Sequence, residues 1–334
     1  MTDPQAPYMN AAIAQAPNEP IRLRPVLRPS ANTGQVLVRI QASGVNPLDT
    51  KIYAGTAAHA RQPLPAILGL DLAGVVEDVG SGVERFRPGD EVYGMTGGVG
   101  GLPGTLAQFA AVDADLLAIK PMNLSMRESA ALPLAFITAW EGLVDRAAVH
   151  DNQTVLIHGG AGGIGQIAVQ LANTLGAKVF ATGSQGQRDR IEDLGAIFID
   201  YASERVVDYV ERLTGGMGFE VIFDTVGGAT LDASFEAVRR FGHVVSALGW
   251  GTHTLAPLSL RAATYSGIFT LLPLLTNQGR AHHGEILSTA CRLVEAGRVT
   301  PYLDSRRFTL ESVGEAYEAL TSRTARGKLV VDIA

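Results

Sequence analysis

The chain has 334 residues, of which 46% are apolar and 18% charged, so it can bury one large or two ordinary hydrophobic cores. Its formal net charge is -6 and it has no block of five or more Lys/Arg residues, which argues against nucleic-acid binding. Cys291 is the only cysteine. This excludes an intrachain disulfide and a zinc site built from several thiolates.

The first part of the chain is typical of an antiparallel β domain. Between residues 35 and 115, short apolar runs alternate with Gly, Pro, Asp and Ser, which predicts strands at 36–40, 74–79 and 90–93. A Pro-Gly pair at 88–89 predicts a turn just before the third strand, because Pro fixes φ and Gly tolerates positive φ.

The middle of the chain alternates between strands and helices, a rhythm that requires a parallel sheet with helices on both faces. The expected strands lie at 155–158, 179–182, 197–199, 221–223 and 244–247. The expected helices lie at 164–175, at 188–194, through Arg212, and at 230–239. The predicted fold class is therefore α/β, with a doubly wound parallel sheet beside a β-rich domain.

The last part returns to mixed structure, with helices expected at 285–296 and 311–320 and a closing strand at 328–333. No long linker separates the parts, so the doubly wound unit is predicted to be inserted into the first domain. The resulting domain boundaries are residues 1–132, 133–270 and 271–334.

Targeting and membrane signals are also predicted to be absent. Residues 1–20 lack the basic and apolar regions of a secretory signal. The longest apolar stretch, around 268–275, falls well short of the ~20 residues that span a bilayer. We therefore expect a cytoplasmic protein.

A glycine-rich loop follows the first strand of the doubly wound unit. The strand at 154–158 runs into the sequence GGAGGIG at 159–165, and a helix follows. This is the GxGxxG pattern in the strand–turn–helix context of a dinucleotide site, where glycines allow a tight turn and a close approach of backbone N–H groups to a pyrophosphate. A packing role alone is the alternative. The residues expected to bind the pyrophosphate are Gly160, Ala161, Gly162, Gly163, Ile164 and Gly165.

The end of the second strand indicates which dinucleotide binds. NAD enzymes place a carboxylate there to hold the ribose 2′-OH, but this chain has Thr182-Gly183-Ser184. Ser184 and Arg188 can donate hydrogen bonds to a 2′-phosphate. The alternative for Arg188 is a solvated helix residue. NADP(H) is the predicted cofactor.

Several motifs together resemble the medium-chain dehydrogenase/reductase superfamily over nearly the whole chain. They are SGVNPLDTK at 43–51, GLDLAGVV at 69–76, PGDEV at 88–92, LP at 132–133, TAW at 138–140, the glycine loop, LGA at 194–196, DY at 200–201 and FDTVG at 223–227. The resemblance implies a GroES-like catalytic domain, a Rossmann domain and a homodimer.

Departures from the zinc-dependent branch of that superfamily concern the metal ligands. In that branch a Cys opens the site motif and a His-Glu pair follows a glycine, whereas this chain has Asn46 and, after Gly69, Leu70-Asp71. The lobe that carries four zinc-binding cysteines is also missing. No thiolate or imidazole set remains to hold a Lewis-acidic zinc ion. The chain is therefore expected to bind no metal.

The chain resembles the zinc-independent quinone oxidoreductases, which include zeta-crystallin-like proteins, and the alkenal reductases. The shared segment holds Asn46, Asp49 and Lys51, and Tyr53 follows it. In these families an oxyanion develops after hydride transfer, so donors aimed at it are needed. The resemblance implies that Asn46, Lys51 and Tyr53 donate, with Asp49 holding Lys51 or the ribose. The alternatives are a turn residue (Asn46), a structural acceptor (Asp49), and surface or core-edge groups (Lys51 and Tyr53).

The resemblance also implies further cofactor contacts. Asn46 and Thr138 are expected near the nicotinamide, Ser184 and Tyr201 near the 2′-phosphate, and the pair at 248–249 in the loop after the fifth strand. These last two residues are Leu248 and Gly249. Lys328 could also approach the cofactor; a solvated charge at the start of a strand is the alternative. Packing or capping roles are the alternatives for Thr138 and Tyr201.

The function implied is an NADPH-dependent reductase that transfers hydride to a quinone or an α,β-unsaturated carbonyl. One alternative is an enoyl reductase of acyl thioesters, which would need a basic patch for a carrier phosphate. Another is an NADPH-binding structural or RNA-binding protein, although the acidic balance argues against RNA. We expect a small-molecule quinone or enone as substrate, no nucleic-acid or membrane partner, and a homodimer.

Overall fold

The computed structural model describes residues 7–333, so part of the segment predicted to carry no secretory signal lies outside the described residues. Within this range the chain forms two compact units. The first comprises residues up to Leu134 together with Leu271–Gly297 and the residues from Pro301 onward. The second comprises Ala135–Thr270 and Arg298–Thr300.

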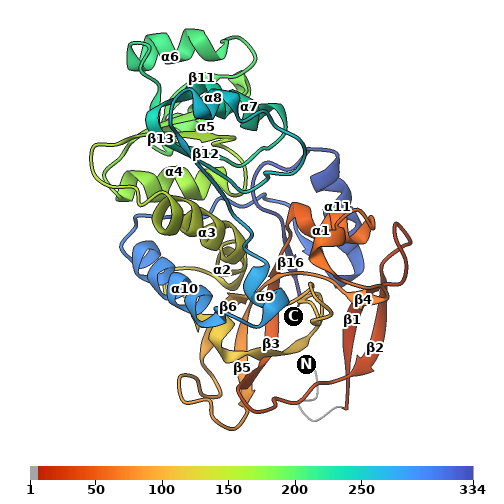
Figure 1. The fold of residues 1–334 in the computed structure, drawn as a ribbon. Helices are drawn as coiled ribbons and strands as arrows, with labels where there is room; N and C mark the ends of the chain where they lie inside the picture. Colours follow the sequence, from red (N-terminus) through yellow and green to blue (C-terminus); the bar gives the residue numbers. More distant parts are fainter. Residues whose placement is uncertain (1–6, 334) are drawn as a thin grey trace. The chain divides into compact units, whose positions relative to one another are not determined.

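The first unit is built on mainly antiparallel sheets, as the alternating apolar runs predicted. Its larger sheet has the order β15-β16-β3-β5-β6-β8, β7 also pairs with β3, and only the β15–β16 pair is parallel among the strand pairs described. Strands β3, β5, β6 and β16 of this sheet are labelled in Figure 1. The strands are β3 Gln35–Gly44, β5 Asp71–Val79, β6 Glu91–Met95, β7 Phe109–Asp113, β8 Leu117–Ile119, β15 Phe308–Thr309 and β16 Val330–Asp332. A second sheet contains β1 Tyr8–Ala14, β2 Arg22–Leu27 and β4 Ala66–Ile67.

Helices of the first unit are mostly short. They are α1 Pro47–Tyr53, η1 Ala58–Ala60, η2 Ala114–Leu116, α2 Met126–Ala130, α9 Leu272–Thr276, α10 Arg280–Glu295, η5 Leu310–Ser312 and α11 Val313–Thr321. Helix α1 packs against α11, with the Tyr53 and Tyr317 rings edge to face at 5.7 Å between centroids. These two helices come from opposite ends of the chain, so the return of the C-terminal segment completes this unit.

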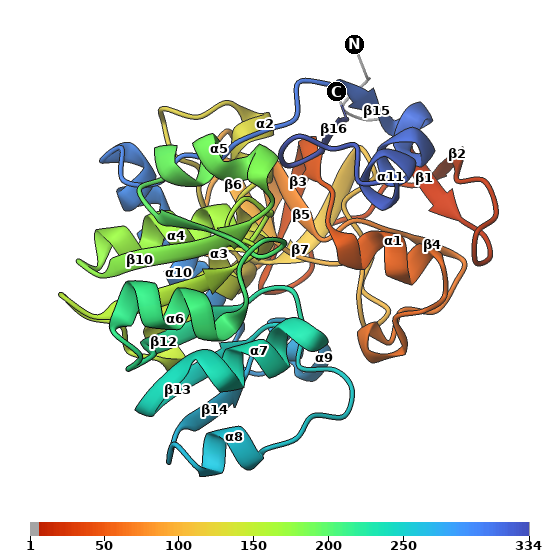
Figure 2. The same cartoon turned by 90° about the horizontal axis from the view of Figure 1, so that it is seen from above.

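The second unit is a six-stranded sheet of order β11-β10-β9-β12-β13-β14, in which every pair is parallel. Figure 2 shows β10, β12, β13 and β14 with helices α6 and α7 beside them. The strands are β9 Thr154–His158, β10 Lys178–Gly183, β11 Ile197–Asp200, β12 Phe219–Asp224, β13 Val238–Ser246 and β14 Thr264–Gly267. This is the predicted doubly wound α/β fold.

Helices follow the strands of this unit in the alternation that the sequence predicted. They are α3 Pro133–Trp140, which begins in the first unit, π-helix η3 Glu141–Arg146, α4 Gly165–Thr174, η4 Gln185–Gln187, α5 Arg188–Asp193, α6 Val206–Thr214, α7 Ala229–Ala237 and α8 Ala256–Ser259. Fully buried aromatic rings of Phe180, Phe219 and Phe235 form much of the core under the sheet. Burying such rings is the main favourable contribution to folding here.

Several predicted boundaries were wrong: the helix expected at 285–296 begins at Arg280, and the strand expected at 244–247 begins at Val238. The helix expected at 230–239 ends at Ala237, because Val238 is extended and pairs with Phe219 of β12. The closing strand expected at 328–333 covers only Val330–Asp332. Lys328 instead donates its N–H to Tyr302 and accepts a bond from the N–H of Asp304. The side chain of Lys328 lies in the interior of the unit. The alternative that it is a solvated charge is therefore wrong.

Among the described residues, no helix is both long and apolar enough to cross a membrane.

Candidate functional site

Helix α1 begins at a position where the expected capping pattern is altered. Asn46 is the N-cap, with extended backbone (φ −120°, ψ 152°), and Pro47 is the first helical residue. Asn at this position normally accepts a backbone N–H with its side chain; here Asn46 and Asp49 form a capping box in which Asp49 Oδ2 accepts the Asn46 N–H, while the Asn46 amide makes no capping hydrogen bond of its own. The N–H of Asp49 donates to the backbone carbonyl of Asn46 at 3.0 Å instead. The amide is therefore free for other partners.

These partners are a carboxylate and an ammonium. Asn46 Nδ2 donates to Asp71 Oδ2 at 2.9 Å, and Lys328 Nζ donates to Asn46 Oδ1. Lys328 Nζ also lies 3.7 Å from Asp71 Oδ2. Asp49 Oδ2 accepts the backbone N–H of Asn46 at 2.7 Å. We call Asn46, Asp49, Asp71 and Lys328 the buried polar cluster, since none is more than 8% exposed.

Close backbone approaches bring these four residues together. Asp71 begins β5 directly opposite Gly44, the last residue of β3. A side chain at Gly44 would overlap the carbonyl oxygen of Ala130, and Gly69 has φ of +97° where a Cβ would overlap the Thr105 hydroxyl. Glycine is required at both places, because only glycine tolerates the crowding and the positive φ. The cluster thus depends on strand register and on two glycines outside it.

Burial changes the protonation of the cluster. Burial raises the pKa of Asp49 to about 7, against the lowering effect of the Asn46 N–H. Burial also raises the pKa of Asp71, opposed by Lys328 and Asn46, and lowers the pKa of Lys328, opposed by Asp71 and Asp49. An ionised Asp71, a charged Lys328 and a protonated Asp49 together give a neutral cluster.

The other two side chains predicted for catalysis lie outside this cluster. Lys51 is exposed, and Asp49 does not hold it: residues two apart on a helix point to different sides, so this expected pairing was wrong. The Tyr53 hydroxyl donates to the Glu19 carbonyl at 2.8 Å, and its ring packs on Tyr317. The structure brings Asn46 and Asp49 together, but not Lys51 or Tyr53 with them.

Asp71 and the buried state of Lys328 were missed from the sequence. Asp71 was noted only as a departure from the zinc-binding His-Glu pair, and Lys328 was weighed as a cofactor contact or a solvated charge. Asp71 directly follows the apolar Leu70 and begins a buried strand. A carboxylate in such a place is a sequence signal that could have identified it as a site residue. Nothing in the sequence places Lys328 beside it, because the two are 257 positions apart in the chain and only strand pairing joins them.

The glycine loop of the second unit has the geometry of an anion site. Gly159 has φ of +73°, and the N–H of Gly162 donates to its carbonyl at 2.9 Å. A Cβ at Gly165 would overlap that same carbonyl, whereas a Cβ at Gly163 would meet nothing within 4 Å. Space therefore remains in front of helix α4, whose N-terminus favours negative charge. The loop residues 160–165 fit a bound pyrophosphate.

Polar groups hold the strand ends beneath this loop. His158 Nδ1 lies 3.2 Å from the Thr182 hydroxyl, which also accepts the Gly159 N–H at 3.1 Å. Thr225 donates its hydroxyl to the His158 carbonyl at 2.7 Å. Burial lowers the pKa of His158 to about 4, against the raising effect of Asp224. His158 is therefore neutral near pH 7 and ties strands together rather than supplying charge.

The residues predicted to select the 2′-phosphate lie at neighbouring strand ends. Ser184 follows β10 and Tyr201 follows β11, and the Tyr201 N–H donates to the carbonyl of Gly183, the residue before Ser184, at 3.3 Å. Arg188 Nη1 is 3.3 Å from Glu192 Oε1, and its guanidinium lies over the Phe198 ring at 4.6 Å. Tyr201 is 63% exposed. All three side chains are accessible to solvent near the carboxyl ends of β10 and β11.

The remaining predicted cofactor contacts divide between the units. Thr138 Oγ1 lies 3.2 Å from Thr270 Oγ1, and Thr138 is buried. The loop after β13 contains Leu248, whose N–H donates to Ser246 Oγ at 3.1 Å, and Gly249, where a Cβ would overlap the Tyr265 hydroxyl. Lys328 belongs to the first unit, in the buried polar cluster.

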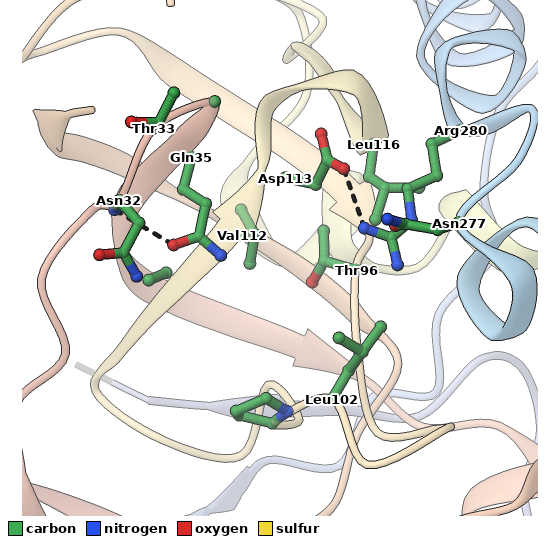
Figure 3. Close-up of a pocket in the computed structure, with 13 residues that line it drawn as sticks. Asn32, Thr33, Gln35, Thr96, Leu102, Val112, Asp113, Leu116, Asn277 and Arg280 are labelled. Atoms are coloured by element: carbon green, nitrogen blue, oxygen red, sulfur yellow. Dashed lines mark hydrogen bonds and ion pairs between the residues drawn. The ribbon is translucent and has the colours of Figure 1, made fainter. Parts of the chain in front are cut away.

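A cavity of about 300 Å³ lies elsewhere in the first unit (Figure 3). Arg280 Nη1 pairs with Asp113 Oδ2 at 2.9 Å on one side of it, and Gln35 lies across from them. The Thr96 hydroxyl is buried there without a partner among the described residues. None of the predicted site residues lines this cavity. It is distinct from the buried polar cluster.

Family comparisons cover both parts of the chain. A family model described as "Alcohol dehydrogenase GroES-like domain" matches residues 32–122, and one described as "Zinc-binding dehydrogenase" matches residues 194–331.

Two curated proteins and two solved structures are similar over most of the chain. A 2-methylene-furan-3-one reductase of Solanum lycopersicum is 36% identical over 91% of this chain and 73% of its own. An NADPH-dependent alkenal/one oxidoreductase, chloroplastic, of Arabidopsis thaliana is 32% identical over 92% and 74%. An alcohol dehydrogenase superfamily protein from Novosphingobium aromaticivorans is 57% identical over 98% and 100%, with a TM-score of 0.96. The quinone oxidoreductase from Coxiella burnetii is 28% identical over 98% and 100%, with a TM-score of 0.83.

Proposed function

The chain belongs to the medium-chain dehydrogenase/reductase superfamily, and from that premise we propose that it is an NADPH-dependent reductase that transfers hydride to an α,β-unsaturated carbonyl or a quinone. Two of its relatives are named as reductases of conjugated carbonyls, and one structural neighbour is named as a quinone oxidoreductase. The observation that carries the proposal is the Asn46 amide, which is held in a buried polar cluster with hydrogen-bonding capacity to spare.

Cofactor binding is assigned to residues of the second unit. The loop at 160–165 would hold the pyrophosphate through its backbone N–H groups and the N-terminus of α4. Ser184, Arg188 and Tyr201 would contact the 2′-phosphate, since no carboxylate at the end of β10 opposes it. When bound, NADPH supplies the hydride. Thr138, Leu248 and Gly249 would lie toward its nicotinamide.

The residues of this chain then have one main electrostatic task. Hydride addition to a conjugated carbonyl moves negative charge onto its oxygen, and a donor already aimed at that oxygen lowers the barrier. An amide nitrogen carries two N–H groups, and Asn46 uses one for Asp71. The second is assigned to the substrate oxygen. Lys51 and Tyr53 stay predicted donors to the substrate, although they lie outside the cluster. Asp49 is assigned to the cluster, where it accepts the Asn46 N–H.

The reaction is proposed to need no metal. Positions that hold ligands in the zinc branch hold Asn46 and Leu70-Asp71, and the residues described here contain no group of three or more His, Cys, Asp or Glu that could bind a metal. The Lys328 ammonium already donates to the Asn46 amide oxygen. A divalent cation at the same amide would be repelled by that ammonium. The positive charge at this site is therefore the ammonium group of Lys328.

Turnover tests the proposal directly. Loss of the absorbance of NADPH, and separately of NADH, is followed with a panel of enones and quinones, with and without a chelator. We expect oxidation of NADPH in preference to NADH, unaffected by the chelator. Activity abolished by chelation would contradict the metal-free assignment. Absence of turnover with every acceptor would contradict the reductase assignment and favour a non-enzymatic NADPH-binding role.

The Asn46→Ala variant tests the donor role. Removing one oxyanion donor typically lowers kcat by ~10²-fold or more, so we expect a loss of that size with NADPH affinity unchanged. Full activity in this variant would remove Asn46 from the site.

A homodimer and a cytoplasmic location both stay predictions. The mass of the protein in solution, measured by light scattering, tests the dimer.

A further inference from the structure

The Asn46 amide lies between two partners that can bond it in one orientation only. An ammonium is only a donor and an ionised carboxylate only an acceptor. Lys328 Nζ faces the amide oxygen, and Asp71 Oδ2 faces the amide nitrogen at 2.9 Å. A flipped amide would bring Nδ2 toward the ammonium and Oδ1 toward the carboxylate, with two repulsive contacts in place of two hydrogen bonds. The orientation of this amide is therefore fixed by charge.

Both partners are themselves held in place. Asp71 is fully buried and its Oδ1 accepts the N–H of Leu134 at 3.0 Å. The backbone of Lys328 is bonded to Tyr302 and Asp304 through its N–H and carbonyl. The backbone bonds fix where the Lys328 side chain begins, and moving its ammonium into solvent would leave the buried Asp71 charge unpaired, which costs several kcal/mol. The amide is thus oriented by two rigid neighbours.

The local cost of this arrangement indicates that it serves more than folding. Burying Asp49 beside Asp71 adds a second carboxylate to a site that holds one ammonium. Rules of local stability are broken in this way mostly at functional sites. The cluster is best explained by what it does to Asn46.

We propose that Lys328 and Asp71 are positioning residues that orient the Asn46 amide so that its second Nδ2–H points to the substrate oxygen. This inference rests on the proposed reductase function. The Lys328 ammonium also polarises the amide through Oδ1, which makes the free N–H a stronger donor. Lys328 therefore acts on the reaction through Asn46.

The pH dependence of this orientation follows from the groups that face Asp71. These are Lys328 and Asn46, the N–H of Leu134, and Asp49 from helix α1. Asp71 fixes the amide only while ionised, because a protonated carboxyl can also donate. Since burial raises the pKa of Asp71, kcat should fall as the pH is lowered through that pKa. Acidification thus mimics the Asp71→Asn variant.

Steady-state kinetics with matched variants tests the proposal. Residues that orient a functional group typically contribute 10–100-fold to activity. We expect Lys328→Met and Asp71→Asn to lower kcat by about that factor with NADPH affinity unchanged, and Lys328→Arg to recover part of it. Arg280→Met removes another largely covered cation that is paired with a carboxylate, beside the cavity of Figure 3 and outside the buried polar cluster, and should leave kcat unchanged.

An isotope effect separates positioning from folding. With NADPH deuterated at the transferred hydrogen, weaker stabilisation of the oxyanion makes hydride transfer more rate-limiting. The isotope effect on kcat should therefore rise in Lys328→Met. A variant that is merely less well folded loses active protein without changing the isotope effect. An unchanged isotope effect together with unchanged kcat would overturn the proposal.

A measurement without turnover keeps this inference separate from the proposed function. In protein labelled with ¹⁵N at Asn side chains, the Asn46 signal is identified by its loss in Asn46→Ala. The two Nδ2 protons give separate signals in every Asn because rotation about the amide C–N bond is slow, so the readout is their chemical shifts and their exchange with water. We expect the proton bonded to Asp71 to be shifted and slow to exchange in the wild type, and this shift and protection to be lost in Lys328→Met and Asp71→Asn. Shifts and exchange rates in the wild type like those of a solvated Asn would overturn the proposal even if the enzyme is active. A shifted, protected proton in a protein without turnover would leave the orientation established and the reductase assignment wrong.

Discussion

Asp71 in the first unit and Asp224 in the second are both fully buried carboxylates at the ends of sheet strands, and they are satisfied in opposite ways. Asp224 accepts from the N–H groups of Val226 and Gly227 and from the Ser246 hydroxyl, at 2.7–3.2 Å. All of these donors are neutral. Asp71 accepts one backbone N–H and one amide N–H, and an ammonium lies 3.7 Å away.

The difference separates a carboxylate that joins strands from one that, in our proposal, orients a site residue. The donors of Asp224 come from its own turn and from the adjacent strand β13, so the carboxylate closes a loop and joins two strands. The partners of Asp71 come from three distant segments, and they include a cation and a side chain with an unused donor. A buried carboxylate with local, neutral and complete bonding indicates architecture. One with distant and charged partners indicates a site.

Removing the structural carboxylate should give the largest loss of stability. In Asp224→Ala the N–H groups of Val226 and Gly227 and the Ser246 hydroxyl lose their acceptor inside the protein. Each unsatisfied buried group costs roughly 1–3 kcal/mol, so we expect a loss of about 3 kcal/mol, seen as a lower Tm by calorimetry. The isosteric Asp224→Asn variant, which retains one carbonyl acceptor, should lose less. Equal Tm values for wild type and Asp224→Ala would break the comparison.

Replacing the buried carboxylate Asp49 should have the opposite effect and stabilise the first unit. Asp49 has a folded-state pKa of about 7, above its ordinary value of 3.8. Its contribution to stability is therefore fully present below about pH 4 and is lost as the pH rises toward 7. Asp49→Asn keeps an acceptor for the Asn46 N–H and removes this loss, so it should gain on the order of 2 kcal/mol relative to wild type at pH 8.

The measurement is the difference in Tm between Asp49→Asn and wild type at several pH values. The difference should grow from pH 5 to pH 8. A constant difference across this range would show that Asp49 is ionised throughout, and the neutral cluster would then be wrong.

The two units also differ in the burial of their cations. Lys328 in the first unit is buried, whereas Arg188 in the second is a surface residue paired with Glu192. In Arg188→Ala we expect the KM for NADPH to rise about tenfold, corresponding to ~1.4 kcal/mol of lost binding to the 2′-phosphate. The KM for NADH should not change, since NADH lacks that phosphate. Parallel changes for both cofactors would remove Arg188 from the 2′-phosphate site.

A buried polar group with no partner at all completes the series. The Thr96 hydroxyl lies at the cavity of Figure 3 without a hydrogen bond among the described residues. Thr96→Val has nearly the same shape and removes this group, so it should raise stability by about 1 kcal/mol. The test is denaturant unfolding of both proteins. A loss of stability would mean that the hydroxyl bonds a molecule in the cavity.

The sequence by itself determined the fold class and the position of the dinucleotide loop. Strand-then-helix alternation and the GxGxxG spacing are local patterns, and the physics that fixes them acts over a few neighbouring residues. This is why β9, the glycine loop and α4 lie within one residue of the expected bounds. Asn46 and Asp49 were also found locally, because they belong to one short motif at the start of α1.

Only the tertiary structure decided what these residues touch. Lys328 reaches Asn46 because its backbone bonds to Tyr302 and Asp304 instead of continuing the closing strand. Asp71 reaches the same amide because β5 pairs with β3 in a register that sets Asp71 opposite Gly44. Register and burial are properties of distant segments packed together, and burial is also what shifts the pKa of each charged member of the cluster. The motif supplied the amide, and packing supplied the charges that orient it.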